Sequence, residues 1–349
     1  MKRKILTCST VLIALAMGDT GLTPPVTVAA AGPTVTWIPT LGGSSSQGYE
    51  NSSTGSVVVG YASNAAGSYR AFRWAAGGPM QDLGDFGYAY AAAYGVSADG
   101  AVVVGEAWNA QFEQRAFRWT AAGGLKDLGT LGGPYAVAAD TSADGSVVVG
   151  VSYDRNSNSH AFRWTAATGM QDLGTFGGYA SAAYGVSADG SVVVGMAYDP
   201  GNVAQPFRWT AATGMRFIGT LGPGDSQAYS VSADGLVVVG ASGGHAFRWT
   251  ATGGMQDLGV AGGFDSAAYD VSGNGSVVVG DFLNAQGSRR AFRWTAATGM
   301  KDLSGTYSGS IGSGSYLVYA NAVSADGSRI TGYGYNRKTN RYTGYTTNP

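Results

Sequence analysis

The chain has 349 residues, and its 21 lysines and arginines against 22 aspartates and glutamates give a formal net charge of −1 at pH 7. The basic residues form no stripe or cluster, which excludes a typical nucleic-acid-binding protein. The 57 glycines recur at regular positions and so indicate turns rather than disorder. We therefore expect a folded chain rich in turns.

The N-terminus has the pattern of a secretory signal. Lys2, Arg3 and Lys4 precede an apolar stretch over residues 5–17, which is short for a membrane span. Small residues follow, and cleavage is predicted after Ala31, with Gly18 as the alternative. Residues 1–31 contain the single cysteine, so the mature chain has no disulfide. We predict a secreted protein, periplasmic or extracellular, without a transmembrane segment in residues 32–349.

A Val-Val-Val-Gly string recurs along the rest of the chain, each time followed by Phe-Arg-Trp. It begins at Val57, Val102, Val147, Val192, Val237 and Val277, and the first four spacings are all 45 residues. A fixed period of this length is typical of repeated supersecondary units that bury their apolar faces against one another. The sequence therefore predicts a repeat architecture.

One repeat contains four predicted strands: residues 183–187, 191–195, 207–210 and a segment beginning at Met215. Ala188-Asp189-Gly190 has the composition of a tight turn after the first strand. Three consecutive valines show no alternation, so the second strand is expected to be buried on both faces. Four strands per repeat indicate the blade of a β-propeller.

The two ends of the chain together complete one further blade. Residues 34–43 match the fourth-strand region at 169–178, and residues 316–349 supply the other three strands. With six complete repeats between about 44 and 303, we predict a single all-β domain over residues 32–349. It would be a seven-bladed propeller of four-stranded antiparallel blades, closed by pairing of N- and C-terminal strands in one blade.

Side-chain register can be predicted from the turn between the third and fourth strands. A four-residue turn would place Thr165 opposite Met170 and Arg163 opposite Asp172, giving a cross-strand ion pair in most repeats. The Trp of each Phe-Arg-Trp triplet, such as Trp164, is expected to pack between blades.

The repeat also resembles a known family. His-Ala-Phe-Arg-Trp-Thr occurs at residues 160–165 and 245–250, each time followed by Gly-Met-Gln-Asp-Leu-Gly. These segments resemble the bacterial extracellular HAF repeat, and the resemblance covers nearly all of residues 32–349. It implies an exported or cell-surface protein without a settled biochemical activity. Histidine occurs in only two repeats, so we expect no metal site, and no cofactor is predicted.

The variable loops at one end of the blades are the predicted binding surface, because aromatic and charged residues are mixed there. The candidates are Trp108, Phe112, Arg115, Tyr153, Asp154, Arg155, Tyr198, Asp199, Phe282 and Arg289. We interpret the protein as a monomeric binding or surface-interaction module for an extracellular protein or glycan. The competing interpretation is a purely structural surface protein, in which the loops vary freely as long as they stay polar.

An enzymatic function is the alternative. Glu50, Asp140 and Asp270 occupy the same position of the first strand in three repeats. If that position lines the propeller channel, the three carboxylates converge and raise one another's pKa, as in acid–base catalysis on a glycan or another polymer. Solvated residues of the channel wall are the simpler interpretation, and the sequence leans toward a protein that is not an enzyme.

Overall fold

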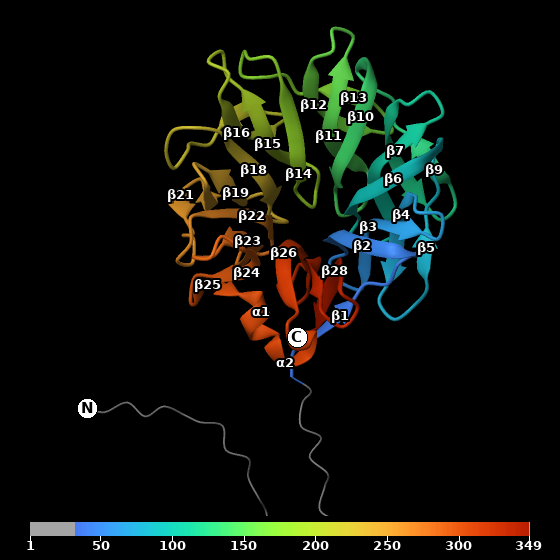
Figure 1. Ribbon diagram of the computed structural model, residues 1–349. Coiled ribbons are helices and arrows are strands. Elements are labelled where there is room, and N and C mark those ends of the chain that lie inside the picture. The colour runs from blue at the N-terminus through green and yellow to red at the C-terminus, as the bar shows by residue number, and fades with distance from the viewer. Residues whose placement is uncertain (1–31, 349) are drawn as a thin grey trace, which may run out of the picture. The chain divides into compact units, whose positions relative to one another are not determined.

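The computed structural model describes residues 32–348 (Figure 1), so the predicted signal segment 1–31 lies outside the described residues. The described part of the chain is almost entirely antiparallel β-structure, in sheets that are mostly four-stranded. The predicted all-β class is confirmed. None of the helices in residues 32–348 is long and apolar enough to cross a membrane.

The strands follow one another in sheets, each running from an inner to an outer strand. The first two groups are β2 (Gly42–Asn51), β3 (Val57–Asn64), β4 (Tyr69–Ala75) and β5 (Met80–Asp82), then β6 (Gly87–Val96), β7 (Val102–Asn109), β8 (Gln114–Thr120) and β9 (Gly124–Asp127). The next two are β10 (Gly132–Thr141), β11 (Val147–Asp154), β12 (Ser159–Thr165) and β13 (Gly169–Asp172), then β14 (Ser181–Val186), β15 (Val192–Tyr198), β16 (Ala204–Thr210) and β17 (Gly214–Phe217).

The later groups are β18 (Ser226–Val231), β19 (Val237–Ser242), β20 (His245–Thr250) and β21 (Gly254–Asp257), then β22 (Asp265–Val271), β23 (Val277–Leu283), β24 (Arg289–Thr295) and β25 (Gly299–Asp302). The last sheet combines β1 (Thr34–Trp37) with β26 (Tyr316–Val323), β27 (Ile330–Asn336) and β28 (Arg341–Asn348), in the order β1-β28-β27-β26. One parallel bridge, between Tyr69 and Tyr90, joins the first two groups into an eight-stranded sheet.

The sheets are arranged around a common centre, with the first strand of each group toward the middle (Figure 1). Each first strand contacts the first strand of the next group, and β26 contacts β2. At the other side of the last sheet, β1 pairs antiparallel with β28, from Thr34 opposite Asn348 to Trp37 opposite Tyr345. The first and last described strands therefore share one sheet.

The triple valines pack on both faces of their strands, as the sequence predicts. Val57, Val58 and Val59 are all buried. Val57 and Val59 join a cluster that contains Phe117 and Trp119 of the next group, whereas Val58 packs with Phe72 and Trp74 of its own group. The core is thus divided into layers between neighbouring sheets, and the tryptophans belong to these layers.

Turns at one end of the sheets hold neighbouring groups together through the backbone. The residue two positions before each turn glycine donates its N–H to the equivalent carbonyl of the next group. The donors and acceptors run Ser53 to Ala98, Ala98 to Ala143, Ala143 to Ala188, Ala188 to Ala233, Ala233 to Gly273, Gly273 to Ala325 and Ala325 to Ser53. These seven hydrogen bonds, of 2.9–3.1 Å, return to the residue at which they began.

The predicted register of the third and fourth strands is wrong by one residue. Thr165 lies opposite Gly169 and Arg163 opposite Gln171, while Phe162 faces Asp172. Gly169 has a φ of 66°, so only three residues form the loop and the glycine already belongs to the pairing strands. Because side chains alternate between faces, a one-residue shift exchanges every predicted partner.

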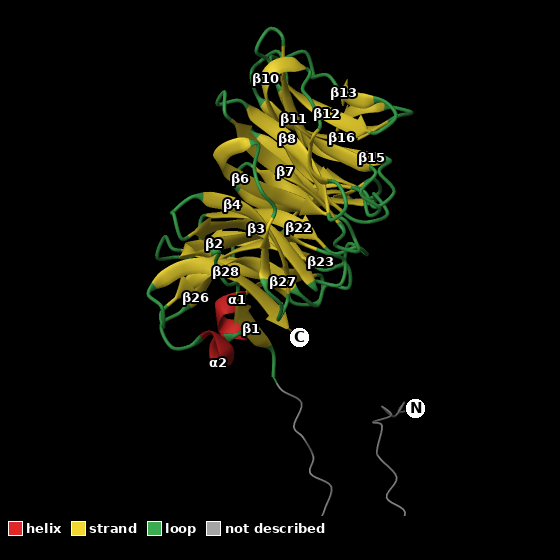
Figure 2. Ribbon diagram, turned by 90° about the vertical axis from the view of Figure 1, so that its right-hand side faces the viewer, coloured by secondary structure: helices red, strands yellow, loops and turns green. Residues whose placement is uncertain are grey.

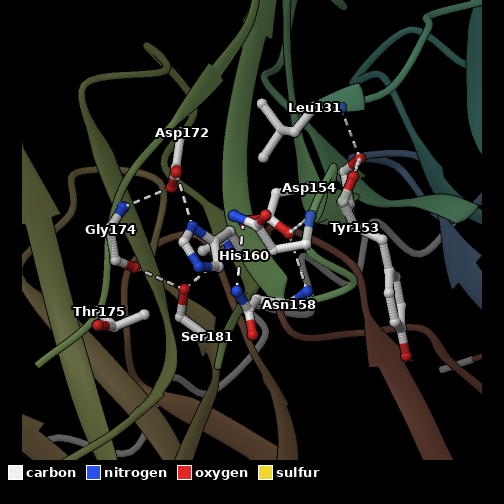
Figure 3. A network of polar contacts seen from close by, with 12 residues as sticks. Leu131, Tyr153, Asp154, Asn158, His160, Asp172, Gly174, Thr175 and Ser181 are labelled. Atoms are coloured by element: carbon white, nitrogen blue, oxygen red, sulfur yellow. Dashed lines mark hydrogen bonds and ion pairs between the residues drawn. The ribbon is translucent and has the colours of Figure 1, made fainter. Parts of the chain in front are cut away.

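Two other contacts replace the predicted Arg–Asp pair. Arg163 donates to the carbonyl of Gly190 in the next group, at 3.2–3.3 Å. Asp172 instead accepts from His160, whose Nδ1 lies 2.6 Å from the carboxylate (Figure 3). His245 and Asp257 make the same contact at 2.8 Å. The histidine of the repeat signature therefore contacts the aspartate of the fourth strand.

Residues 303–311 form the only helices among the described residues, α1 (Leu303–Thr306) and α2 (Ser308–Ile311). Figure 2 shows them at the edge of the fold beside β1. Leu303, Tyr307 and Ile311 are buried in the same cluster as Tyr345 of β28. This Gly- and Ser-rich segment thus extends the core around the N-terminal strand.

Candidate functional site

The three predicted acids lie on inner strands, immediately after a β-bulge. In β2, β10 and β22 the pairing skips one residue, and Glu50, Asp140 and Asp270 are the first residues to pair again. Such bulges bend the strand and re-aim the neighbouring side chains. The three carboxyl groups are close enough to interact electrostatically, because both aspartates raise the pKa of Glu50.

Hydrogen bonds hold two of these acids between sheets. Asp140 accepts from the N–H of Thr141 at 2.7 Å and of Val186, in the next group, at 2.9 Å. Asp270 accepts from the Ser230 hydroxyl at 2.6 Å and from the N–H of Val323 at 2.7 Å. Each carboxylate therefore joins its own sheet to a neighbour, which is a structural role that the sequence does not reveal.

Burial dominates the proton affinity of this cluster. Desolvation raises the pKa of Asp140 to about 7, although its two backbone hydrogen bonds favour the carboxylate. The pKa of Asp270 rises to about 6 for the same reason. Desolvation and the two neighbouring aspartates raise the pKa of Glu50 well above its ordinary value. The cluster can thus exchange protons near neutral pH.

The bulge residues themselves form a second inner layer, which is mostly tyrosine. The residues are Tyr49, Tyr94, Ala139, Tyr184, Tyr229, Tyr269 and Asn321. Tyr49 and Tyr94 lie 5.1 Å apart between ring centroids, and Tyr184, Tyr229 and Tyr269 follow at 5.7 Å each. The hydroxyl groups of Tyr94 and Tyr269 donate to Glu106 and Asp281, which lie on the second strands β7 and β23.

A pocket of about 330 Å³ opens beside Glu106 at the loop-bearing end of β6, β7 and β8. Its walls are Tyr88, Tyr90, Trp108, Glu106 and Gln114. The Trp108 ring lies 6.2 Å from Tyr88 and 6.4 Å from Tyr90, the latter at 81°. Aromatic walls around a few polar groups are typical of small-ligand sites.

Phe112 adds an exposed aromatic ring to the rim of this pocket. It is 59% exposed and lies 5.0 Å from Tyr88. Its φ is 61°, at the turn position where the first and sixth groups have Gly67 and Gly287. A bulky residue with positive φ is strained by about 1–2 kcal/mol relative to glycine. Ser157 and Asn202 of the third and fourth groups also have positive φ at this position, so the conformation belongs to the turn and only the choice of a bulky side chain is particular to the second group.

Of the residues predicted from the loops, Trp108 lines this pocket, and Phe112 packs beside it against Tyr88. Arg115 lies behind it and is held by ion pairs with Glu113 and Asp127. Sequence reasoning missed Tyr88, Tyr90, Glu106 and Gln114. Glu106 directly follows a Val-Val-Val-Gly string, where alignment of the repeats would have marked it and Asp281 as the only acids.

The candidates of the next two groups lie on the same end of the fold but apart from the pocket. Tyr153 packs edge-on against Tyr135 at 5.5 Å, and Tyr198 stacks on Tyr179 at 4.6 Å. Arg155 packs against Gly132. These pairs leave aromatic surface at the loop end, and their part in binding stays a prediction.

Asp154 and Asp199 stabilise their own loops. The Asp154 carboxylate accepts from the N–H groups of Asn156 and Asn158 at 2.8 and 2.9 Å (Figure 3). Asp199 accepts from Gly201 and Val203 at 2.8 and 3.1 Å. Side chains that satisfy the turn backbone in this way are Asx turns.

The predicted exposure of the sixth-group residues is wrong for the aromatic one. Phe282 is 4% exposed and packs in the layer that contains Val239 and Phe292. The strand β23 runs four residues beyond the valines, and residues 280–282 are buried, so Phe282 continues the core. Arg289 is partly exposed and forms ion pairs with Asp265 and with the buried Asp281.

Within residues 32–348 no group of three or more His, Cys, Asp or Glu side chains is placed to hold a metal ion. No family model matches the chain, and no curated protein sequence does. The likeness to the HAF repeat therefore stays a prediction.

Solved structures with a similar fold are β-propeller proteins. TolB from Acinetobacter baumannii aligns with a TM-score of 0.52 and 14% identity over 71% of this chain and 63% of TolB. Puromycin hydrolase, as the S511A mutant complexed with PGG, aligns at 0.55 and 14% identity over 86% of this chain and 53% of the hydrolase. The β-propeller domain of the Trilobed protease from Pyrococcus furiosus aligns at 0.56 and 11% identity over 86% and 94%.

The chain spans less than two thirds of the length of TolB and of puromycin hydrolase. At identities of 11–14% these alignments carry information on the fold alone. The described residues have a β-propeller fold.

Proposed function

We propose that residues 32–349 form an exported seven-bladed β-propeller that binds an extracellular ligand, a protein or a glycan, through its loop-bearing end. The predicted signal segment and the resemblance to the HAF repeat support export. Fractionation of the producing cells tests it: the protein is expected outside the cytoplasm, and a cytoplasmic protein would contradict it.

Three observations support a closed ring of seven blades. The eight-stranded sheet consists of two four-stranded groups held by a single bridge, so the groups number seven. The pairing of β1 with β28 supplies the fourth strand of the last group. The seven backbone hydrogen bonds between turns run from group to group and back to Ser53. A ring of this kind leaves only short, protected sheet edges.

The aromatic pocket beside Glu106 carries the functional proposal. Three aromatic rings and two polar side chains surround it, and the exposed Phe112 ring packs against one of them, Tyr88. Aromatic residues supply most of the binding free energy at many recognition surfaces. The turns at the opposite end are instead occupied with backbone contacts between blades.

Glycan and protein arrays with purified residues 32–349 test this function, with Trp108→Ala as the diagnostic variant. Loss of an anchor of this kind is expected to weaken binding at least about tenfold. Phe217→Ala is the matched control, because Phe217 is 54% exposed on an outermost strand, β17. Equal binding by both variants and the unmodified chain would assign recognition to another surface.

An extracellular polymer-degrading enzyme is the second candidate, and the pKa of about 7 at Asp140 favours it. Hydrogen bonds from the next sheet to Asp140 and to Asp270 favour the structural role instead. Glu50→Gln, Asp140→Asn and Asp270→Asn separate the two. An enzyme would lose turnover in correctly folded variants, whereas a binding module would keep its ligand.

A further inference from the structure

Glu106 is a buried carboxylate whose charge no neighbouring side chain neutralises. It is 5% exposed at the base of the aromatic pocket. Tyr94 donates to one of its oxygens at 2.8 Å, and the Gln114 amide donates to the other. Both donors are neutral, and among residues 32–348 Glu106 forms no ion pair. A buried charge without a counter-charge is costly, and burial accordingly raises the pKa of Glu106.

The sixth group contains the same arrangement with the charge neutralised. Asp281 follows its Val-Val-Val-Gly string as Glu106 does, and Tyr269 donates to it just as Tyr94 donates to Glu106. At the position of Gln114 this group has Arg289, which forms an ion pair with Asp281. The repeat therefore provides its own comparison: where the acid is 0% exposed and the positions of Tyr90 and Trp108 are not aromatic, a guanidinium group supplies the positive charge.

The residues around the two acids differ in a consistent way. Tyr90 and Trp108 of the pocket correspond to Asp265 and Leu283 beside Asp281. Aromatic faces attract cations, and they favour weakly hydrated ones such as alkylated ammonium groups. In the second group, therefore, the neutral Gln114 replaces the arginine, and beside it lies a pocket with aromatic walls and a carboxylate, both suited to positive charge.

Resting on the proposed ligand-binding role of this end, we infer that the Glu106 pocket binds an organic cation of the quaternary ammonium type. The cation would lie in the pocket beside Gln114, which stands where the sixth group has Arg289. Tyr90 and Trp108 would contact its alkyl groups, and Glu106 would supply the counter-charge. The pocket volume of about 330 Å³ accommodates such a head group. No basic residue lines the pocket, which disfavours anionic ligands.

Calorimetric titration of residues 32–349 with tetramethylammonium chloride tests the inference, against sodium chloride at equal ionic strength and glucose as a neutral probe. Saturable binding of tetramethylammonium alone is expected. Glu106→Gln and Trp108→Ala are expected to weaken it at least about tenfold. Gln114→Arg copies the sixth group and is expected to abolish binding, because an internal cation then pairs with Glu106.

Gln114→Arg also guards against misfolding as an explanation, since its melting temperature should equal or exceed that of the unmodified chain. Absence of tetramethylammonium binding, or equal binding by the Gln114→Arg variant, would overturn the inference. Glucose binding that is lost in Trp108→Ala would also overturn the inference, but it would leave the proposed ligand-binding function intact. Equal array binding by Trp108→Ala and the unmodified chain would instead contradict the proposed function itself. Choline and Nε-trimethyllysine, titrated next, distinguish a small free quaternary ammonium ion from a trimethylated side chain of a partner protein.

Discussion

Replacement of Asp140 by Asn is expected to change how stability depends on pH. The pKa of Asp140 is about 7 in the folded chain, against an ordinary 3.8. Between these values the folded chain binds more protons than the unfolded chain, so the free energy of unfolding falls as the pH rises. From pH 5 to pH 8 the loss due to Asp140 alone is about 3 kcal/mol, at about 1.4 kcal/mol per pKa unit.

Asp140→Asn cannot ionise, so its stability should decline less over this window. The amide keeps one acceptor oxygen for Thr141 or Val186 and loses the other contact, at a cost of about 1–3 kcal/mol. That cost applies at every pH and leaves the slope unchanged. Between pH 5 and pH 8 the free energy of unfolding of the variant should therefore rise by about 3 kcal/mol relative to that of the unmodified chain.

Urea unfolding followed by tryptophan fluorescence at several pH values measures this difference. Asp189→Asn is the control: hydrogen bonds from Ser187 and Ser191 lower the pKa of Asp189 to about 2, so its carboxylate is ionised throughout the window. Its stability should run parallel to that of the unmodified chain. If Asp140→Asn also runs parallel, burial does not raise the pKa of Asp140 and the cluster carries no proton near neutral pH.

Three further predictions follow from local geometry. Phe112→Gly relieves strain but loses the contact with Tyr88, so the free energy of unfolding should change by less than about 1 kcal/mol while ligand binding falls; a large loss of stability in urea would contradict this. Gly150→Ala should lower the free energy of unfolding by about 3 kcal/mol or more, because a Cβ there would lie 2.0 Å from the Val137 carbonyl oxygen. In thermal unfolding the control Gly222→Ala, whose Cβ would have no neighbour within 4 Å, should match the unmodified chain. Deletion of residues 32–38 removes β1 and leaves the edge of β28 unpaired, so size-exclusion chromatography should show aggregates, and a stable monomer would argue against the role of β1.

The sequence predicts the repeated scaffold well because its signals are local and occur many times. Three adjacent valines indicate a strand covered on both sides, and Val57 to Val59 are buried accordingly. The register of the outer strands depended instead on the conformation of one glycine, Gly169, whose positive φ shortens the loop by one residue. That single difference exchanged Arg163 for His160 as the partner of Asp172. Backbone conformation at a turn is not encoded in the hydrophobic pattern.

The candidate site was only half predictable, because its polar members face inward. Trp108 and Phe112 could be found as aromatic residues in a variable loop, but Glu106 lies within a buried strand, where a polar residue is easily overlooked. Phe282 shows the opposite error, since its strand extends the core beyond the valines. Burial of each side chain depends on the neighbouring sheet, which a single repeat does not contain.

Comparison between repeats recovers what the hydrophobic pattern misses. Positions that recur unchanged, such as the turn residues and the valines, hold neighbouring sheets together. The position after the glycine of the string is occupied by Tyr61, Val151, Met196 and Ala241 in four other groups, none of which is charged at neutral pH. A carboxylate there is stable only with a counter-charge or a compensating gain. Asp281 has its counter-charge in Arg289, whereas Glu106 has an aromatic pocket beside it, and this difference between two corresponding positions is why we propose the ligand site at the second group.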